Sequence, residues 1–176
     1  MLARLALASS DGPFAHLPAP TDERESLSRK QAGPAIQLYQ ILRERHPADD
    51  PLEIVREVMI AGALIFLDHC LGSLTPSLFG ELPIEERERL VERLASRFFN
   101  ATVRLDEVGA DRVRLTVTAC RFASLAREAA VPELAPLFCA GDEAYFGRVQ
   151  PDVELSRPHT IAEGAQSCPF ELRRRG

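Results

Sequence analysis

The amino-acid sequence predicts an α+β fold, in which a helical N-terminal half is followed by a ββ-αα-ββ unit with a four-stranded antiparallel sheet. Two observations support this prediction. Before Asn100, apolar residues recur at helical spacing, whereas from Val103 to Ala119 they alternate with polar residues. Two helical segments follow, and two further strand-like segments end the chain. Paired hairpins on either side of helices favour one antiparallel sheet with helices on one face.

The first part of the chain is predicted to be a flexible arm. Residues 1–30 mix small, proline and charged residues without a sustained period. Residues 31–176 then form a single α+β domain, which is long enough to bury a core without cross-links. The first helix of this domain is expected to start at Pro34, which suits a first helical turn, and to end near His46.

A second helix is expected after Asp50. Asp50, Pro51 and Glu53 match an N-cap, a first-turn proline and a glutamate that returns a bond to the cap. The helix should run to about Leu71. Because its second half is apolar on all sides, we expect other elements to cover it. Pro83 opens a third helix, whose charged residues lie on a solvated face.

The strand that ends at Ala119 alternates between apolar and polar residues. By parity, Cys120 continues the polar face that carries Thr116 and Thr118. The later elements expected are two helices, at residues 122–130 and from Pro132, and two strands, at residues 153–162 and 167–173.

Composition excludes several classes of function. A net charge of -5 disfavours nucleic acid or an anionic membrane as the main partner, because phosphate binding needs a concentrated positive surface. The longest apolar run, residues 58–67, is about half of the ~20 residues that a membrane-spanning helix needs. The N-terminal apolar stretch is too short for a secretory signal, so a cytoplasmic location is expected. The four cysteines have no CxxC spacing and are expected to be free thiols.

Three cysteines and a carboxylate fall between residues 120 and 170: Cys120, Cys139, Cys168 and Asp142. Cys139 and Asp142 lie three positions apart on a predicted helix and so share one face. Such a pair suits a metal half-site or a nucleophile beside a base, or else a buried cysteine next to an exposed carboxylate. The three cysteines together could hold a divalent metal, although their separations match no zinc signature.

In the third strand, Arg157 and His159 share parity with the inward residues Val153 and Leu155. A buried arginine needs an anionic partner, so Arg157 either pairs with Asp142 or lines a pocket that holds a carboxylate. His159 is a satisfied strand histidine or a ligand-binding residue. Cys168 also points inward, as core filler or as a pocket thiol.

The order of these residues resembles a known family. The string runs Cys120-Arg121-Phe122, Pro132-Glu133-Leu134, Leu137-Phe138-Cys139-x-x-Asp142, Leu155-Ser156-Arg157-x-x-Thr160-Ile161-x-x-Gly164-x-x-x-Cys168-x-Phe170, and it is similar to the L-2-amino-thiazoline-4-carboxylic acid hydrolases. The resemblance implies hydrolytic opening of a cyclic amidine that carries a carboxylate, giving N-carbamoylcysteine on a bacterial route to cysteine. The residues that match the family pattern are Cys120, Cys139, Asp142, Arg157, Thr160, Gly164 and Cys168.

The leading hypothesis is therefore a hydrolase acting on the carbon–nitrogen bond of a small cyclic amidine. The nucleophile would be the Cys139 thiolate or a metal-bound water, with Asp142 as base or ligand and Cys120 and Cys168 as further site thiols. The substrate-binding residues would be Arg157, His159 and Thr160. The alternative is a non-enzymatic domain that binds a metal or a small ligand through the cysteine cluster. The helical half could also form a homodimer.

Overall fold

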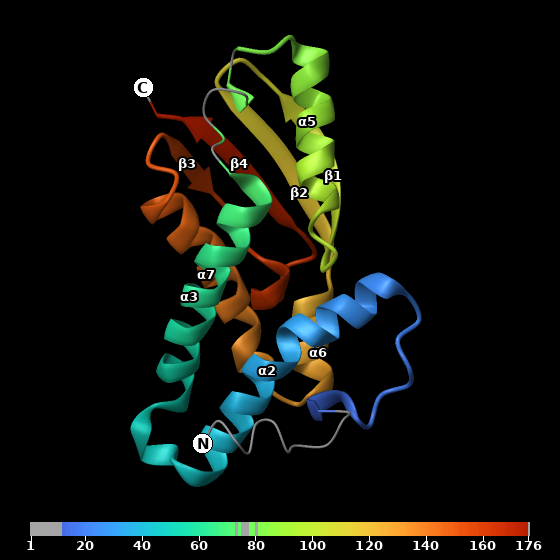
Figure 1. Cartoon of the computed structure of the whole chain (residues 1–176), viewed down its shortest axis with the longest axis vertical. Coiled ribbons are helices and arrows are strands. Elements are labelled where there is room, and N and C mark those ends of the chain that lie inside the picture. Colours follow the sequence, from blue (N-terminus) through green and yellow to red (C-terminus); the bar gives the residue numbers. More distant parts are fainter. Residues whose placement is uncertain (1–11, 73, 75–77, 80, 176) are drawn as a thin grey trace.

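The computed structural model describes residues 12–72, 74, 78–79 and 81–175. Its α-helices are α2 (Glu23–Arg45), α3 (Pro51–Leu71), α5 (Ile84–Ser96), α6 (Arg121–Glu128) and α7 (Ala135–Arg148) (Figure 1). Its strands are β1 (Ala101–Val108), β2 (Arg112–Cys120), β3 (Val153–Ser156) and β4 (Cys168–Arg174), and short 3-10 turns lie at Gly12–Phe14, Pro47–Asp49, Pro132–Leu134 and Ile161–Glu163. None of the described helices is long and apolar enough to cross a membrane.

The strands form one antiparallel sheet in the order β1-β2-β4-β3. One face of the sheet carries the buried side chains Val113, Val117, Cys168 and Leu172. The other face carries charged pairs such as Arg114 with Glu171, 2.5 Å apart. Helices cover the apolar face, with α3 and α7 packed against each other (Figure 1). The predicted α+β fold with a ββ-αα-ββ unit is confirmed.

Two apolar cores lie at the two ends of the molecule. The first, away from the sheet, joins α2, the start of α3, α6 and the start of α7 through residues that include Ile36, Tyr39, Val55, Phe122, Leu134 and Leu137. The second joins the sheet to the C-terminal parts of α3 and α7 through residues that include Leu67, Val91, Val113, Tyr145, Phe146 and Leu172. Helices α3 and α7 therefore run through both cores.

Helix α2 starts at Glu23, not at Pro34 as predicted. Asp22 is its N-cap and accepts a hydrogen bond of 2.6 Å from the Glu25 backbone N–H. The Glu25 carboxylate in turn accepts bonds of 3.0 and 2.8 Å from the Thr21 backbone and hydroxyl. This reciprocal capping satisfies N–H groups that would otherwise be unpaired. Pro34 therefore lies inside the helix, and residue 30, the expected end of the arm, also falls within it. Residues 1–11 of the predicted arm lie outside the described residues.

Helix α3 starts as predicted, with the Asp50 carboxylate accepting a bond of 3.3 Å from the Glu53 backbone N–H. The prediction that other elements cover its apolar second half is wrong on one side. Val58 is 52% exposed and Ile65 is 76% exposed. The opposite side lies close to α7, where a Cβ on Gly141 would stand 2.5 Å from the Cβ of Ala63. Glycine at position 141 thus permits the close approach of the two helices.

Two strand predictions need correction. The strand expected at residues 153–162 ends at Ser156. Pro158 cannot donate to a ladder, and Thr160 instead caps a 3-10 turn by accepting a bond of 3.2 Å from the Glu163 backbone N–H. Near the end of β2, Thr102 pairs with Ala119 and Val103 pairs with Val117, so the register skips one residue.

Because of this irregularity, Cys120 lies on the face of the sheet opposite to the polar face predicted for it. Thr118 and Ala119 are both exposed, and Cys120 returns to the inner side of the sheet. A β-bulge has this effect because it places two residues of one strand opposite one residue of its partner.

Candidate active site

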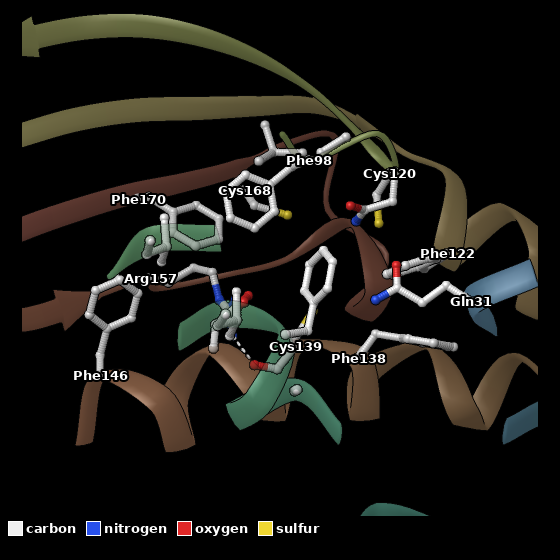
Figure 2. Close-up of a pocket in the computed structure, with 18 of the residues that line it drawn as sticks. Gln31, Phe98, Cys120, Phe122, Phe138, Cys139, Phe146, Arg157, Cys168 and Phe170 are labelled. Atoms are coloured by element: carbon white, nitrogen blue, oxygen red, sulfur yellow. Dashed lines mark hydrogen bonds and ion pairs between the residues drawn. The ribbon is translucent and has the colours of Figure 1, made fainter. Parts of the chain in front are cut away.

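A cavity of about 940 Å³ lies where the two cores meet. Its wall is built from α2, α3, α5, α6, α7 and the apolar face of the sheet. Figure 2 shows Cys139 and Phe146 on α7 below Cys168 and Phe170 on the sheet, and Phe138 on the side of Phe122 and Gln31. Val58 and Gly62 line the cavity and are exposed, so it meets solvent beside α3.

The wall of the cavity is mainly apolar and includes several aromatic side chains. Six of the chain's nine phenylalanines line the cavity: Phe66, Phe98, Phe122, Phe138, Phe146 and Phe170. The rings of Phe122 and Phe138 lie 4.6 Å apart and bridge α6 and α7. Such a wall favours apolar ligands and weakens the screening of any charge placed within it.

One ion pair lies in this apolar wall. The Arg157 guanidinium donates from Nη1 to Oδ2 of Asp142 at 2.7 Å, and from Nη2 to the Cys139 carbonyl at 3.0 Å and to Glu143 at 2.9 Å. Only 3% of the Arg157 side chain is exposed. Its third nitrogen, Nε, is buried and has no acceptor among the described residues.

The environment of Asp142 raises the pKa of its carboxyl group. Burial raises the pKa of Asp142 to about 6, although Arg157 lowers it. The Oδ1 oxygen of this carboxylate accepts no hydrogen bond from the described residues, whereas Oδ2 is held by Arg157. A carboxylate with a pKa near neutrality and one free oxygen suits general-base chemistry.

The three predicted site cysteines all line the cavity. Burial raises the pKa of Cys139 to about 12, against the lowering effect of Arg157. Burial also raises the pKa of Cys120. Near neutral pH both side chains are therefore thiols. All four cysteines are free, as predicted, and Cys70 lies outside the cavity wall.

The Cys168 sulfur has a structural partner. Its Sγ accepts a hydrogen bond of 3.1 Å from the Ile161 backbone N–H, which joins β4 to the 3-10 turn. Within the described residues, no group of three or more histidine, cysteine or acidic side chains is placed to hold a metal ion.

Two of the predicted substrate-binding residues lie away from the cavity wall. His159 is exposed, and Thr160 is 4% exposed, with its hydroxyl donating to Glu163 at 2.8 Å. Gly164 has a φ of 98°, which is a backbone conformation that suits glycine and ends the turn. Arg157, Asp142 and the three cysteines are thus the predicted residues that the fold brings to one cavity.

Other lining residues come from the N-terminal half, which sequence reasoning did not connect with the site. They include Gln31 from α2 and Asn100 before β1, both carboxamides, together with Phe66 and Phe98. No short motif marks them. Phe66 falls within the apolar part of α3, and an apolar residue there is equally typical of a filled core.

An α+β domain with a buried ion pair in a large apolar cavity has the architecture of a protein that binds or transforms small molecules. The family model for L-2-amino-thiazoline-4-carboxylic acid hydrolase matches residues 28–172. The chain therefore belongs to this family of hydrolases, as its sequence resemblance indicated. No curated protein sequence matches the chain.

Proposed function

We propose that this protein is a hydrolase that adds water to the C=N carbon of a cyclic amidine and so opens the ring, with Asp142 as the general base. The observation that carries this proposal is the carboxylate of Asp142, which is held by Arg157 in an apolar cavity and has a pKa of about 6. Membership of the family supports hydrolysis of a thiazoline-type ring.

The reaction begins with water next to the free Oδ1 of Asp142. Asp142 takes a proton from this water as the water oxygen attacks the amidine carbon, and it passes this proton to the amidine nitrogen as the C=N double bond becomes a single bond. The tetrahedral carbon then forms a C=O bond as its C–S bond breaks, and the hydroxyl proton passes to the ring sulfur, which leaves as a thiol. For a 2-aminothiazoline the product is an open-chain urea with a free thiol, so one water is consumed and no oxidant is needed.

Arg157 acts as a positioning residue in this scheme. Its two terminal nitrogens are already bound to Asp142, Glu143 and the Cys139 carbonyl, so they hold the base and leave no free fork for a substrate carboxylate. A buried N–H without an acceptor costs about 1–3 kcal/mol. Arg157 Nε has no acceptor among the described residues, so this cost offsets part of the stabilisation from the ion pair.

A Cys139 nucleophile is less well supported. A thiol with a pKa of about 12 forms little thiolate near neutral pH, and thiolate is the reactive species. Water needs no prior ionisation, because Asp142 accepts its proton during the attack, so water is the better supported nucleophile.

The test uses Asp142→Asn with Glu143→Gln as its matched control. Both carboxylates pair with Arg157, but Asp142 lines the cavity whereas Glu143 is 69% exposed. With 2-amino-2-thiazoline-4-carboxylate, measured by nuclear magnetic resonance, we expect Asp142→Asn to lower kcat/KM by on the order of 10²–10⁴. Glu143→Gln should stay within about fivefold, because exposed ion pairs contribute ~1 kcal/mol or less.

The pH profile gives the second readout. Asp142 must be deprotonated to accept a proton, so kcat/KM should rise with pH through an apparent pKa of about 6 and then level off. This limb should be absent in Asp142→Asn. Equal losses in the two variants, or an unchanged limb in Asp142→Asn, would rule out Asp142 as the base.

A further inference from the structure

The cavity is much larger than a small single-ring acid requires. Its volume of about 940 Å³ corresponds to roughly thirty water molecules at ~30 Å³ each. This volume lies near the upper end of the ~300–1,000 Å³ range of small-molecule pockets. A thiazoline acid bound at Asp142 would leave most of the cavity to water.

The polar and apolar parts of the wall are unevenly distributed. Asp142 and Arg157 are the only charged side chains among the described lining residues. Phe122 and Phe138 stack on the side toward α6 and Gln31 (Figure 2). The cavity thus offers one polar anchor, the carboxylate of Asp142 with its free Oδ1, and an apolar surface that reaches Phe122 and Phe138.

The anchor itself suits a cation better than an anion. The terminal nitrogens of Arg157 are already bound to Asp142, Glu143 and the Cys139 carbonyl, whereas Oδ1 of Asp142 accepts no hydrogen bond from the described residues. An amidinium group can donate to the free Oδ1 of Asp142, whereas a ligand carboxylate would face a carboxylate.

From these features we infer that the substrates of this site are cyclic amidines with a large apolar substituent, such as an aryl or long alkyl group. This inference rests on the proposed function. The substituent displaces water from the aromatic wall, and each buried methylene should strengthen binding by about fourfold, equivalent to ~0.8 kcal/mol. The amidine remains at Asp142, where water attacks it.

Two glycine variants separate this inference from general effects on folding. Gly62 on α3 lines the cavity, and Gly147 on α7 does not. A Cβ at either position meets no atom within 4 Å, so a leucine can be introduced without a backbone clash. Both glycines are exposed helix residues, where replacement by leucine also favours the helix. Gly62→Leu narrows the cavity, and Gly147→Leu is the matched control.

Binding and hydrolysis are measured separately for 2-amino-2-thiazoline and its 5-benzyl derivative, by calorimetry and by nuclear magnetic resonance. We expect the benzyl group to lower Kd by at least about tenfold, as burial of several carbon atoms implies. Gly62→Leu should remove most of this gain without weakening the parent compound, and Gly147→Leu should keep it.

The outcomes distinguish the two proposals. If the parent is hydrolysed but the benzyl group gives no gain in Kd, the substrate class proposed here is wrong and the hydrolase proposal stands. If the benzyl compound binds tightly and neither compound is hydrolysed, the proposed function fails while the apolar ligand site remains. An equal effect of Gly62→Leu and Gly147→Leu would overturn the assignment of the substituent to this cavity.

Discussion

At the scale of single residues, the site depends on how burial changes the protonation of two neighbours on α7. The pKa of Asp142 rises to about 6, so it is largely ionised at neutral pH and can still accept a proton. The pKa of Cys139 rises to about 12, so its thiol stays protonated. The same apolar wall thus makes Asp142 a usable base and keeps Cys139 out of its nucleophilic thiolate form.

This difference predicts slow alkylation of Cys139. At pH 8 a thiol with a pKa of about 12 is ionised to only ~10⁻⁴, and thiolate is the species that reacts with iodoacetamide. We expect labelling at Cys139, located by peptide mass spectrometry, to be far slower than that of free N-acetylcysteine and to show no inflection between pH 7 and 10. Fast labelling of Cys139 at pH 7 would instead support the thiolate mechanism.

At the scale of elements, the contact between α3 and α7 positions Asp142. Gly141 precedes the base directly, and the missing side chain lets α7 approach Ala63 on α3. The two helices bring together cavity residues from both halves of the chain, because Gly62 and Phe66 lie on one and Cys139 and Asp142 lie on the other.

Gly141→Ala should therefore destabilise the fold. The new Cβ would stand 2.5 Å from that of Ala63, so the helices must separate, and overpacking of this kind costs about 1–3 kcal/mol. Adding Ala63→Gly should recover part of the loss in a urea titration. Gly147→Ala on the same helix, where a Cβ meets nothing within 4 Å, should be neutral or stabilising by up to ~1 kcal/mol. Purely additive effects of the Gly141 and Ala63 changes would contradict a direct clash.

The elements that could be predicted are those with local signals. Asp50 marks the start of α3 because its capping pattern acts within a few residues. Asp22 and Glu25 form an equally local cap, but the prolines and glycines before them and Pro34 after them suggested a break where the helix continues. The reversal at Cys120 was not predictable, because a bulge is defined by the partner strand.

The candidate site likewise has features with a local sequence signal and features that depend on residues far apart in the chain. The inward parity of Arg157 and the position of Asp142 beside Cys139 on one helix were enough to predict the ion pair between Arg157 and Asp142 as one alternative. The aromatic wall was not predictable, since its members come from elements far apart in sequence. Helical periodicity identifies an apolar face but does not distinguish a filled core from a cavity.

At the scale of the whole molecule, a buried polar network connects the end of α3 to the end of α7. Gln150 is 5% exposed as a residue. Its carboxamide nitrogen donates to the Gly72 carbonyl at 2.6 Å and to the Tyr145 hydroxyl at 2.7 Å. Its oxygen accepts a bond of 3.4 Å from the Leu74 backbone N–H. One side chain thus joins the segment after α3 to the C-terminal end of α7.

Gln150→Leu should weaken this junction. The change leaves the Leu74 N–H without its partner and removes a donor to Gly72, and an unsatisfied buried group costs about 1–3 kcal/mol. We expect a lower urea midpoint with an unchanged m-value. Gln166→Leu, at an exposed position in the loop before β4, is the control and should shift the midpoint little. Equal shifts for both glutamines would show that the network adds no stability.

The cavity at the boundary of the two cores links the amount of folded protein to its ligand. Val55 and Leu67 place α3 in both cores, as Leu137 and Phe146 place α7, so a molecule that fills the cavity adds contacts to each core. A ligand that binds only the folded chain stabilises it by about 2.7 kcal/mol at a hundred times its Kd. Because proteases act mainly on opened chains, the lifetime of the protein in a cell would then rise and fall with the supply of its own substrate.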